Sequence, residues 1–246
     1  MNNVLLSFLI TTIAGLSTLL GIFTVFVDKK NRERLISCSL VFSAGIMIYI
    51  SIFDLIPSGV KYIFSYYDIF ISILISLIFI IFGFLFIKFL NSLLKEDNSL
   101  YKVGIISVIA LIIHNIPEGI ITFMTTTKDV KIGLSLSFAI ALHNIPEGIS
   151  IFIPLYYGSC NKKKAFLYTF IAGFSELLGA LLSYFFLFRF VNDYFFSFLF
   201  CVTAGIMIYI AFCELLPEGF KYKKWITLLI WMFIGLLIMF FSEFIV

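Results

Sequence analysis

The chain has 246 residues, of which 62% are hydrophobic and 13% are charged, and its formal net charge is +3. Soluble domains carry about 25% charged residues, so this composition, with a mean hydropathy of +1.13, excludes a soluble globular protein. We predict an all-α integral membrane protein in which residues 1–246 form a single transmembrane domain surrounded by the lipid bilayer. We expect no nucleic-acid partner.

Eight apolar runs each approach the roughly 20 residues that a helix needs to cross the hydrocarbon of a bilayer. The predicted spans are 4–27, 35–57, 69–90, 103–125, 132–155, 165–188, 197–217 and 225–245. The first run opens without a positive charge, and its basic cluster follows the apolar stretch, which is not the order of a secretory signal. We therefore interpret it as a retained first helix.

Basic residues are distributed unevenly along the predicted connections. Thirteen of the seventeen Lys and Arg residues lie near the connections that follow the first, third, fifth and seventh spans. The other four are Lys61, Lys128, Lys131 and Arg189. Because cytoplasmic loops carry an excess of basic residues, we predict a multi-pass protein of the cell membrane with both termini outside the cytoplasm.

The two halves of the chain repeat one another. Residues 43–62 and 203–222 are identical at twelve of twenty positions, and residues 13–21 and 171–179 at seven of nine. The paired spans are five apart in order, so they cross the membrane in opposite directions. This predicts an inverted repeat of spans 1–3 and 6–8 around a central pair, spans 4 and 5. Inverted repeats are typical of secondary transporters, whose substrate sites lie near the bilayer midplane.

The central pair carries the same polar hexapeptide, HNIPEG, at 114–119 and at 143–148, which together contain both histidines of the chain. Within each copy, His and Glu are four residues apart and share one helical face. A further carboxylate, Glu176, lies at the same predicted depth in the sixth span. The candidate ligands are therefore His114, Asn115, Glu118, His143, Asn144, Glu147 and Glu176.

The chemistry of this set indicates a metal site. A buried carboxylate is costly unless it is paired or binds a metal, and the middles of spans 4, 5 and 6 contain no Lys or Arg. Imidazole, amide and carboxylate ligands suit Zn²⁺ and Fe²⁺, and also Mn²⁺. The alternative is a polar helix-packing motif, in which Gly119 and Gly148 permit close approach of the helices.

A different class of function is a membrane-embedded dinuclear metalloenzyme, because paired His and carboxylate helices also build di-iron sites. Such sites usually contain a Glu-x-x-His spacing, which this chain lacks, and an enzyme needs no inverted repeat. A transporter is therefore the favoured hypothesis.

Two further acids, Asp54 and Glu214, occupy equivalent positions in the repeat, near the ends of the second and seventh spans. Because these spans run in opposite directions, the two acids are expected near opposite faces of the membrane. They would either attract cations at the two mouths of a pathway or form solvated helix ends capped by the proline that follows. The sequence leaves both interpretations open.

Five segments resemble the ZIP family of metal-ion transporters, and within it the bacterial ZupT-type permeases. They are SAGIMIYISIFDLIP at 43–57, HNIPEG at 114–119, HNIPEG at 143–148, SELLGA at 175–180 and TAGIMIYIAFCELLP at 203–217. The resemblance implies a transporter rather than an enzyme, with eight helices and both termini outside. It implies uptake of Zn²⁺, and of Fe²⁺, Mn²⁺ or Cd²⁺, through a binuclear site on helices 4, 5 and 6, so that the metal is the substrate and no cofactor is expected.

Position by position, the resemblance implies two metal ions with shared ligands. The first would be held by His114, Glu118, His143 and Glu147, and the second by Asn115, Asn144 and Glu176, with Glu118 and Glu147 bridging. Leu177 stands where many relatives have proline, which predicts a less broken sixth helix. Gly15, Ser17 and Gly21 would suit contacts in a homodimer, although packing within one chain is the favoured role for such small residues.

Overall fold

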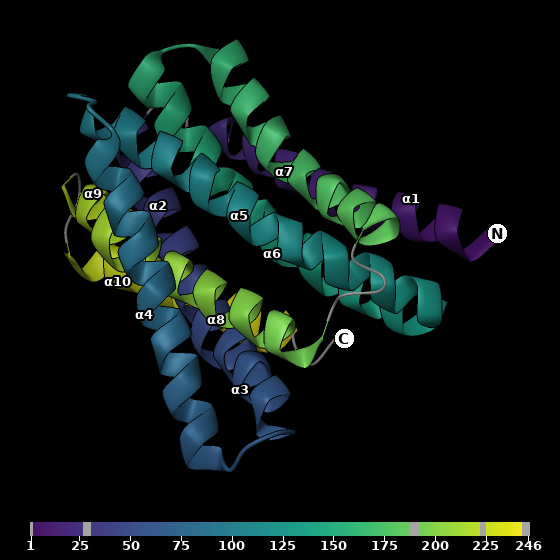
Figure 1. Ribbon diagram of the computed structural model, residues 1–246. Helices are drawn as coiled ribbons and strands as arrows, with labels where there is room; N and C mark the ends of the chain where they lie inside the picture. The colour runs from purple at the N-terminus through teal and green to yellow at the C-terminus, as the bar shows by residue number, and fades with distance from the viewer. Residues whose placement is uncertain (1, 27–30, 187–191, 222–224, 243–246) are drawn as a thin grey trace.

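The computed structural model describes residues 2–26, 31–186, 192–221 and 225–242, and these residues form helices joined by short connections, with no strand among them (Figure 1). In chain order the helices are α1 (Asn2–Leu16), the 3₁₀ helix η1 (Ser17–Phe26), α2 (Arg32–Tyr49), the π-helix η2 (Ile50–Leu55), α3 (Ile56–Phe64), α4 (Ile69–Leu93), α5 (Ser99–Lys128), α6 (Val130–Ser159), α7 (Lys162–Phe185), α8 (Asp193–Tyr209), the π-helix η4 (Ile210–Leu215), α9 (Leu216–Phe220) and α10 (Trp225–Ser242).

Seven helical segments of the described chain are long and apolar enough to cross a membrane, and the shorter apolar helix Trp225–Phe241 lies where the eighth span is predicted. The predicted all-helical membrane fold is confirmed. Part of the predicted charge asymmetry rests on residues outside the described ones: Lys29, Lys30, Arg189, Lys223 and Lys224.

Asparagine and aspartate begin most of the long helices. In each case the side-chain oxygen accepts a hydrogen bond from a backbone N–H of the first turn, which satisfies a donor that the helix itself leaves unpaired. The capping residues are Asn31, Asp68, Asn98, Asp129, Asn161 and Asn192. Caps Asp129 and Asn161 belong to very short connections, so α5, α6 and α7 are consecutive helices that pack as neighbours.

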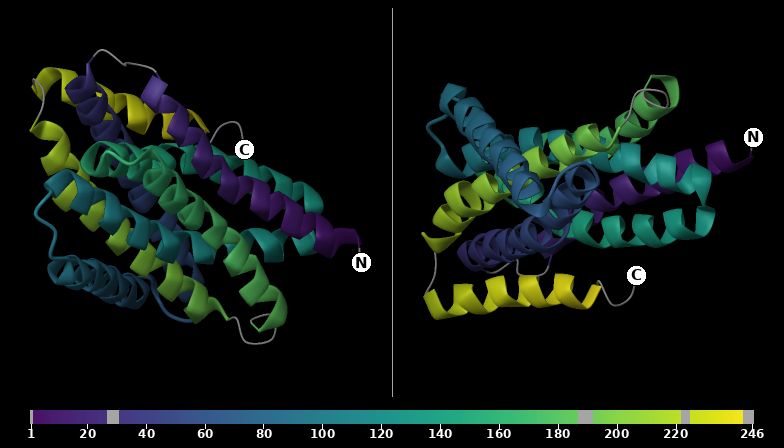
Figure 2. Two further views of the ribbon diagram at one scale, coloured as in Figure 1. Left: turned by 90° about the horizontal axis from the view of Figure 1, so that it is seen from above. Right: turned by 60° about the horizontal axis from the view of Figure 1, so that its bottom comes forward.

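The helices form two groups. In the first, α1 with η1, α5, α6 and α7 pack around one another, with α5 and α6 at its centre. In the second, α10 lies along α2, and α8 packs against α3 and α4 (Figure 2). The main contact between the groups is α2 against α6. The central pair that carries the duplicated hexapeptide therefore lies in one group, and the helices of Asp54 and Glu214 lie in the other.

Reciprocal backbone contacts agree with an inverted repeat. A Cβ atom on Gly15 would clash with the carbonyl oxygen of Gly173, and one on Gly173 would clash with that of Gly15. These two glycines are equivalent in the aligned segments 13–21 and 171–179. A two-fold axis between equivalent helices produces this kind of mutual contact, and only glycine lets the two backbones come so close.

The second and seventh spans do not end at their prolines. Each passes from an α-helix into a π-helical segment, η2 with Asp54 or η4 with Glu214, and continues as α3 or α9 with Pro57 or Pro217 in the first turn. Proline is tolerated in a first turn because its missing N–H has no helical partner there. The interpretation of Asp54 and Glu214 as helix ends capped by proline is therefore wrong. π-Helical segments are frequent at functional sites.

Candidate metal site

All seven predicted ligands lie in the first helix group, on three neighbouring helices. α5 carries His114, Asn115 and Glu118, α6 carries His143, Asn144 and Glu147, and α7 carries Glu176. Each residue is at most 7% exposed. Both α5 and α6 continue through their internal prolines, so each hexapeptide keeps His and Glu on one helical face.

The imidazole rings of both histidines point at the carboxylates of the hexapeptides. Nε2 of His143 lies 3.0 Å from Oε1 of Glu118. Nε2 of His114 lies 3.3 Å from the same oxygen and 3.2 Å from Oε1 of Glu147, but neither contact of His114 has the geometry of a hydrogen bond. Glu118 therefore bridges the two histidines, and Glu147 lies on the side of His114.

These separations match the spacing of ligands around a small divalent ion. Zinc–ligand bonds of about 2.0–2.2 Å place neighbouring ligands of a tetrahedral ion about 3.3 Å apart. The ligand atoms of His114, Glu118 and His143 all lie within 4.8 Å of one another. An ion coordinated between them would replace the poorly aligned polar contacts with short bonds.

The two asparagines are held with their carbonyl oxygens available. Nδ2 of Asn115 donates to the carbonyl oxygen of Ala172 at 3.0 Å, and Nδ2 of Asn144 donates to that of Ala14 at 2.9 Å. Ala14 and Ala172 are equivalent positions of the repeat. Because each amide nitrogen is fixed on a backbone acceptor, each Oδ1 faces the other way, as an acceptor without a hydrogen bond.

The repeat symmetry of the site is broken at Glu176. Its Oε1 accepts a short hydrogen bond from Nδ2 of Asn144, while its Oε2 makes no hydrogen bond with a described residue. The equivalent position in the other half is Thr18, whose hydroxyl donates to the carbonyl oxygen of Gly15 at 2.7 Å. Only one side of the hexapeptide pair therefore carries a third carboxylate.

Unsatisfied polar atoms are concentrated at this place. Of the sixteen buried side-chain nitrogen and oxygen atoms without a hydrogen bond in the described chain, eight belong to the predicted ligands. Leaving a buried polar atom unpaired costs about 1–3 kcal/mol. A helix-packing motif would be expected to satisfy its own hydrogen bonds, so this concentration favours a bound cation over polar packing alone.

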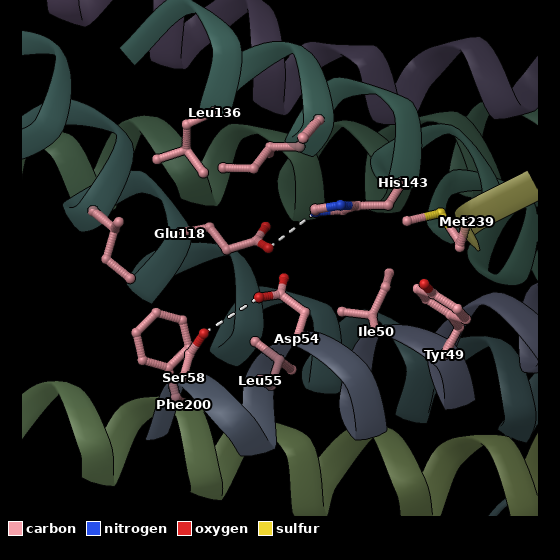
Figure 3. Close-up of a pocket in the computed structure, with 13 residues that line it drawn as sticks. Tyr49, Ile50, Asp54, Leu55, Ser58, Glu118, Leu136, His143, Phe200 and Met239 are labelled. Atoms are coloured by element: carbon pink, nitrogen blue, oxygen red, sulfur yellow. Dashed lines mark hydrogen bonds and ion pairs between the residues drawn. The ribbon is translucent and has the colours of Figure 1, made fainter. Parts of the chain in front are cut away.

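A cavity of about 340 Å³ reaches the site from one side (Figure 3). Glu118 and His143 line its inner end, and Asp54 lies on the facing wall, where its Oδ1 accepts a hydrogen bond of 3.4 Å from Ser58 Oγ. Tyr49 also lines the cavity. Sequence reasoning found Asp54 but missed Tyr49 and Ser58, although Tyr49 lies within the duplicated segment at 44–50.

The other acid of the pair, Glu214, is not among the residues that line this cavity. Nδ2 of Asn91, on α4, donates to the carboxylate of Glu214 and, at 2.8 Å, to the hydroxyl oxygen of Tyr209. Asn91 is not predictable as a partner of Glu214, because no pattern in the sequence indicates that α4 packs against α8. Tyr209 could have been singled out from the sequence, since it is the repeat equivalent of Tyr49.

Known proteins match nearly the whole chain. The family model described as ZIP Zinc transporter matches residues 92–243. Proteins named Zinc transporter ZupT from Oceanobacillus iheyensis and Clostridium perfringens are 39% and 35% identical, with 91% of this chain and 91% and 90% of the relatives covered. A third, from Streptococcus mutans, is 34% identical over 95% of this chain and 94% of its own. These matches are to transporters and not to enzymes, and the chain belongs to the ZIP family of zinc transporters.

Proposed function

We propose that this protein carries divalent metal ions, zinc first among them, across the cell membrane into the cytoplasm. The observation that carries the proposal is the group of buried nitrogen and oxygen atoms without a hydrogen bond on α5, α6 and α7, beside a cavity. The relatives named zinc transporter support zinc as a substrate. Because His, Asn and Glu ligands discriminate poorly among first-row ions, Fe²⁺, Mn²⁺ and Cd²⁺ are expected to compete.

The proposed site is binuclear, and its ligands divide by chemistry. The first ion is assigned to His114, Glu118, His143 and Glu147, and the second to Asn115, Asn144 and Glu176, with Glu118 and Glu147 shared. Three carboxylates and two divalent ions give a net charge of about +1, which is less costly at this depth than an empty anionic cluster or bare ions. The metal is the cargo, and no resident cofactor is part of the proposal.

The proposed path runs past Asp54, through the ligands and out past Glu214. The cavity beside Asp54 supports the entry route, and Glu214, which accepts a hydrogen bond from Asn91, is assigned to the exit side. The metal site is expected to open alternately to the outside and to the cytoplasm as the helix group that contains α5 and α6 moves against the group that contains α2 and α8. With the basic connections in the cytoplasm, both termini and the mouth beside Asp54 are outside.

Competitive uptake into proteoliposomes tests this function. Radioactive zinc is expected to accumulate saturably in vesicles that contain the protein, and unlabelled Fe²⁺, Mn²⁺ or Cd²⁺ should lower the rate. Protein-free vesicles of the same lipid measure the leak. Zinc accumulation no faster than this leak at every concentration would contradict transport.

Glu176→Gln should separate the two metal positions. Because only the second ion depends on Glu176, its affinity should fall about 10- to 100-fold, while the first ion stays bound. Titration of the purified protein with zinc measures both sites. Thr18→Val, at the equivalent position of the other half, is the matched control and should leave both affinities unchanged. A comparable loss of both metals in Glu176→Gln would count against the assignment.

Asp54→Asn should weaken capture without changing the site. Removing a charge from the mouth lowers the local cation concentration, so the apparent KM for zinc should rise several-fold at low ionic strength, with the maximal rate retained. The difference should shrink as salt screens the charge. Asp97→Asn, an exposed acid outside the cavity, is the control. An unchanged KM at low salt would refute a role for Asp54 at the entrance.

A further inference from the structure

A second cavity, of about 370 Å³, lies between the two helix groups and is separate from the metal site. Its walls come from η1 and α6 of the first group and from α2 and α10 of the second. α10 lies on the outside of the helices, along α2 (Figure 2). We call this cavity the α2–α10 groove and define it by Arg34, Cys38, Phe42, Ile149 and Trp231.

The groove has a polar end and an apolar end. Arg34 is in the first turn of α2, at the end of the membrane where the basic connections lie, and Phe42 is two turns deeper. At 1.5 Å per residue, these two positions are about 12 Å apart along the helix. The rings of Phe42 and Trp231 meet edge to face, with centroids 6.3 Å apart, and both side chains are half-buried. An acyl chain whose headgroup lies beside Arg34 would extend along these rings.

Comparison of the two repeats shows why a groove exists here. Cys38 and Ser39 on α2 align with Phe198 and Leu199 on α8. The ring of Phe198 packs against Phe79 of α4, with centroids 5.2 Å apart. α4 is the partner of α8 as α10 is the partner of α2. Small side chains therefore leave space in one half where an aromatic ring fills it in the other.

The charge of Arg34 indicates which kind of molecule would bind in the α2–α10 groove. Arg34 is exposed and forms no ion pair with a carboxylate among the described residues, and its repeat equivalent is the uncharged Tyr194. An apolar groove with a guanidinium at its mouth fits a phospholipid, and the guanidinium prefers an anionic phosphate headgroup. We propose that the α2–α10 groove binds one acyl chain of an anionic phospholipid, with its headgroup phosphate on Arg34.

The position of the groove gives the lipid a route to influence the protein. Ile149 is two residues from Glu147, so the deep end of the groove adjoins the helix that carries half of the hexapeptide ligands. A chain inserted here touches both helix groups at once. Binding of the lipid can nevertheless be measured without measuring metal transport.

Trp231 provides the reporter. The chain has two tryptophans, Trp225 and Trp231, so Trp225→Phe leaves a single fluorophore in the groove. In phosphatidylcholine vesicles, brominated phosphatidylglycerol should reach half-maximal quenching of Trp231 at about fivefold lower mole fraction than brominated phosphatidylcholine. Arg34→Gln in the same background should abolish this preference, and Cys38→Phe should reduce quenching by both lipids.

Lys88→Gln is the matched control, because it removes another exposed basic residue, on α4, which does not line the groove. It should keep the fivefold preference. Equal quenching by the two lipids before mutation, or a preference that survives Arg34→Gln, would overturn the proposal. Quenching that falls as the protein-to-lipid ratio rises would also overturn it, because a second copy of the chain would then cover the groove.

Discussion

Replacing both Glu118 and Glu147 with glutamine is expected to reduce zinc uptake by at least about 100-fold, to the leak of protein-free vesicles. Both carboxylates face the histidines, and both are shared in the proposed site. The same change should raise the thermal stability of the metal-free protein, because the two buried carboxylates face imidazoles, with no Lys or Arg beside them among the described residues, and buried negative charge opposes folding. In one purified variant, the rate of zinc uptake should therefore fall while the melting temperature of the metal-free protein rises.

The melts also distinguish a metal site from polar packing. Zinc should raise the melting temperature of the unmodified protein, since a ligand that binds only the folded state stabilises it, and it should not do so in the double variant. Glu96→Gln, an exposed acid on the connection before α5, is the control and should leave both responses intact. Normal uptake, or an undiminished zinc-dependent rise, in the Glu118→Gln, Glu147→Gln protein would contradict the assigned site.

Alanine at Gly119 and at Gly148 should have similar effects on stability and different effects on metal binding. A Cβ atom at Gly119 would clash with the backbone carbonyl of Glu176, and one at Gly148 with that of Thr18. Each substitution forces two helices apart and should cost about 1–3 kcal/mol of stability. Only Gly119→Ala places its new Cβ directly against the backbone of Glu176, so this variant should lose more affinity at the second metal position than Gly148→Ala, by about tenfold or more.

The pair is its own control, because the two glycines occupy equivalent places in the duplicated hexapeptide. Denaturation curves in detergent measure the stability cost, and zinc titration measures the two affinities. If both variants lost the second metal equally, then helix separation in general, and not movement of Glu176, would explain the loss. That outcome would contradict the proposal that Glu176 makes the two metal positions different.

Much of the fold could be predicted from two features of the sequence. Bilayer thickness sets the length of each apolar run, and the repeated segments indicate that equivalent helices cross the membrane in opposite directions. Helix bounds were less predictable. The run at 35–57 is part of one continuous segment, Arg32–Phe64, which begins at the cap Asn31 and continues past Pro57. Capping residues are polar and lie outside apolar runs, and the π-helical segments have no distinct hydrophobic pattern.

The candidate site could be predicted to the level of residues but not of contacts. Paired HNIPEG segments and Glu176 stand out because they are polar where the chain is otherwise apolar. Which carboxylate lies between the histidines depends on the rotation of α5 against α6, which periodicity alone does not determine. The Asn91–Glu214 contact depends on the packing of α4 against α8. The single-domain organisation and the homodimer stay predictions.

Anomalous diffraction at the zinc edge, from crystals of the protein grown with zinc, tests most directly whether the duplicated hexapeptide holds the transported metal. Two peaks are expected between α5, α6 and α7, the first beside His114 and His143 and the second beside Asn115, Asn144 and Glu176. Crystals of Glu176→Gln should keep the first peak and lose the second. Zinc bound only at other positions, with no peak between these three helices, would contradict the binuclear site.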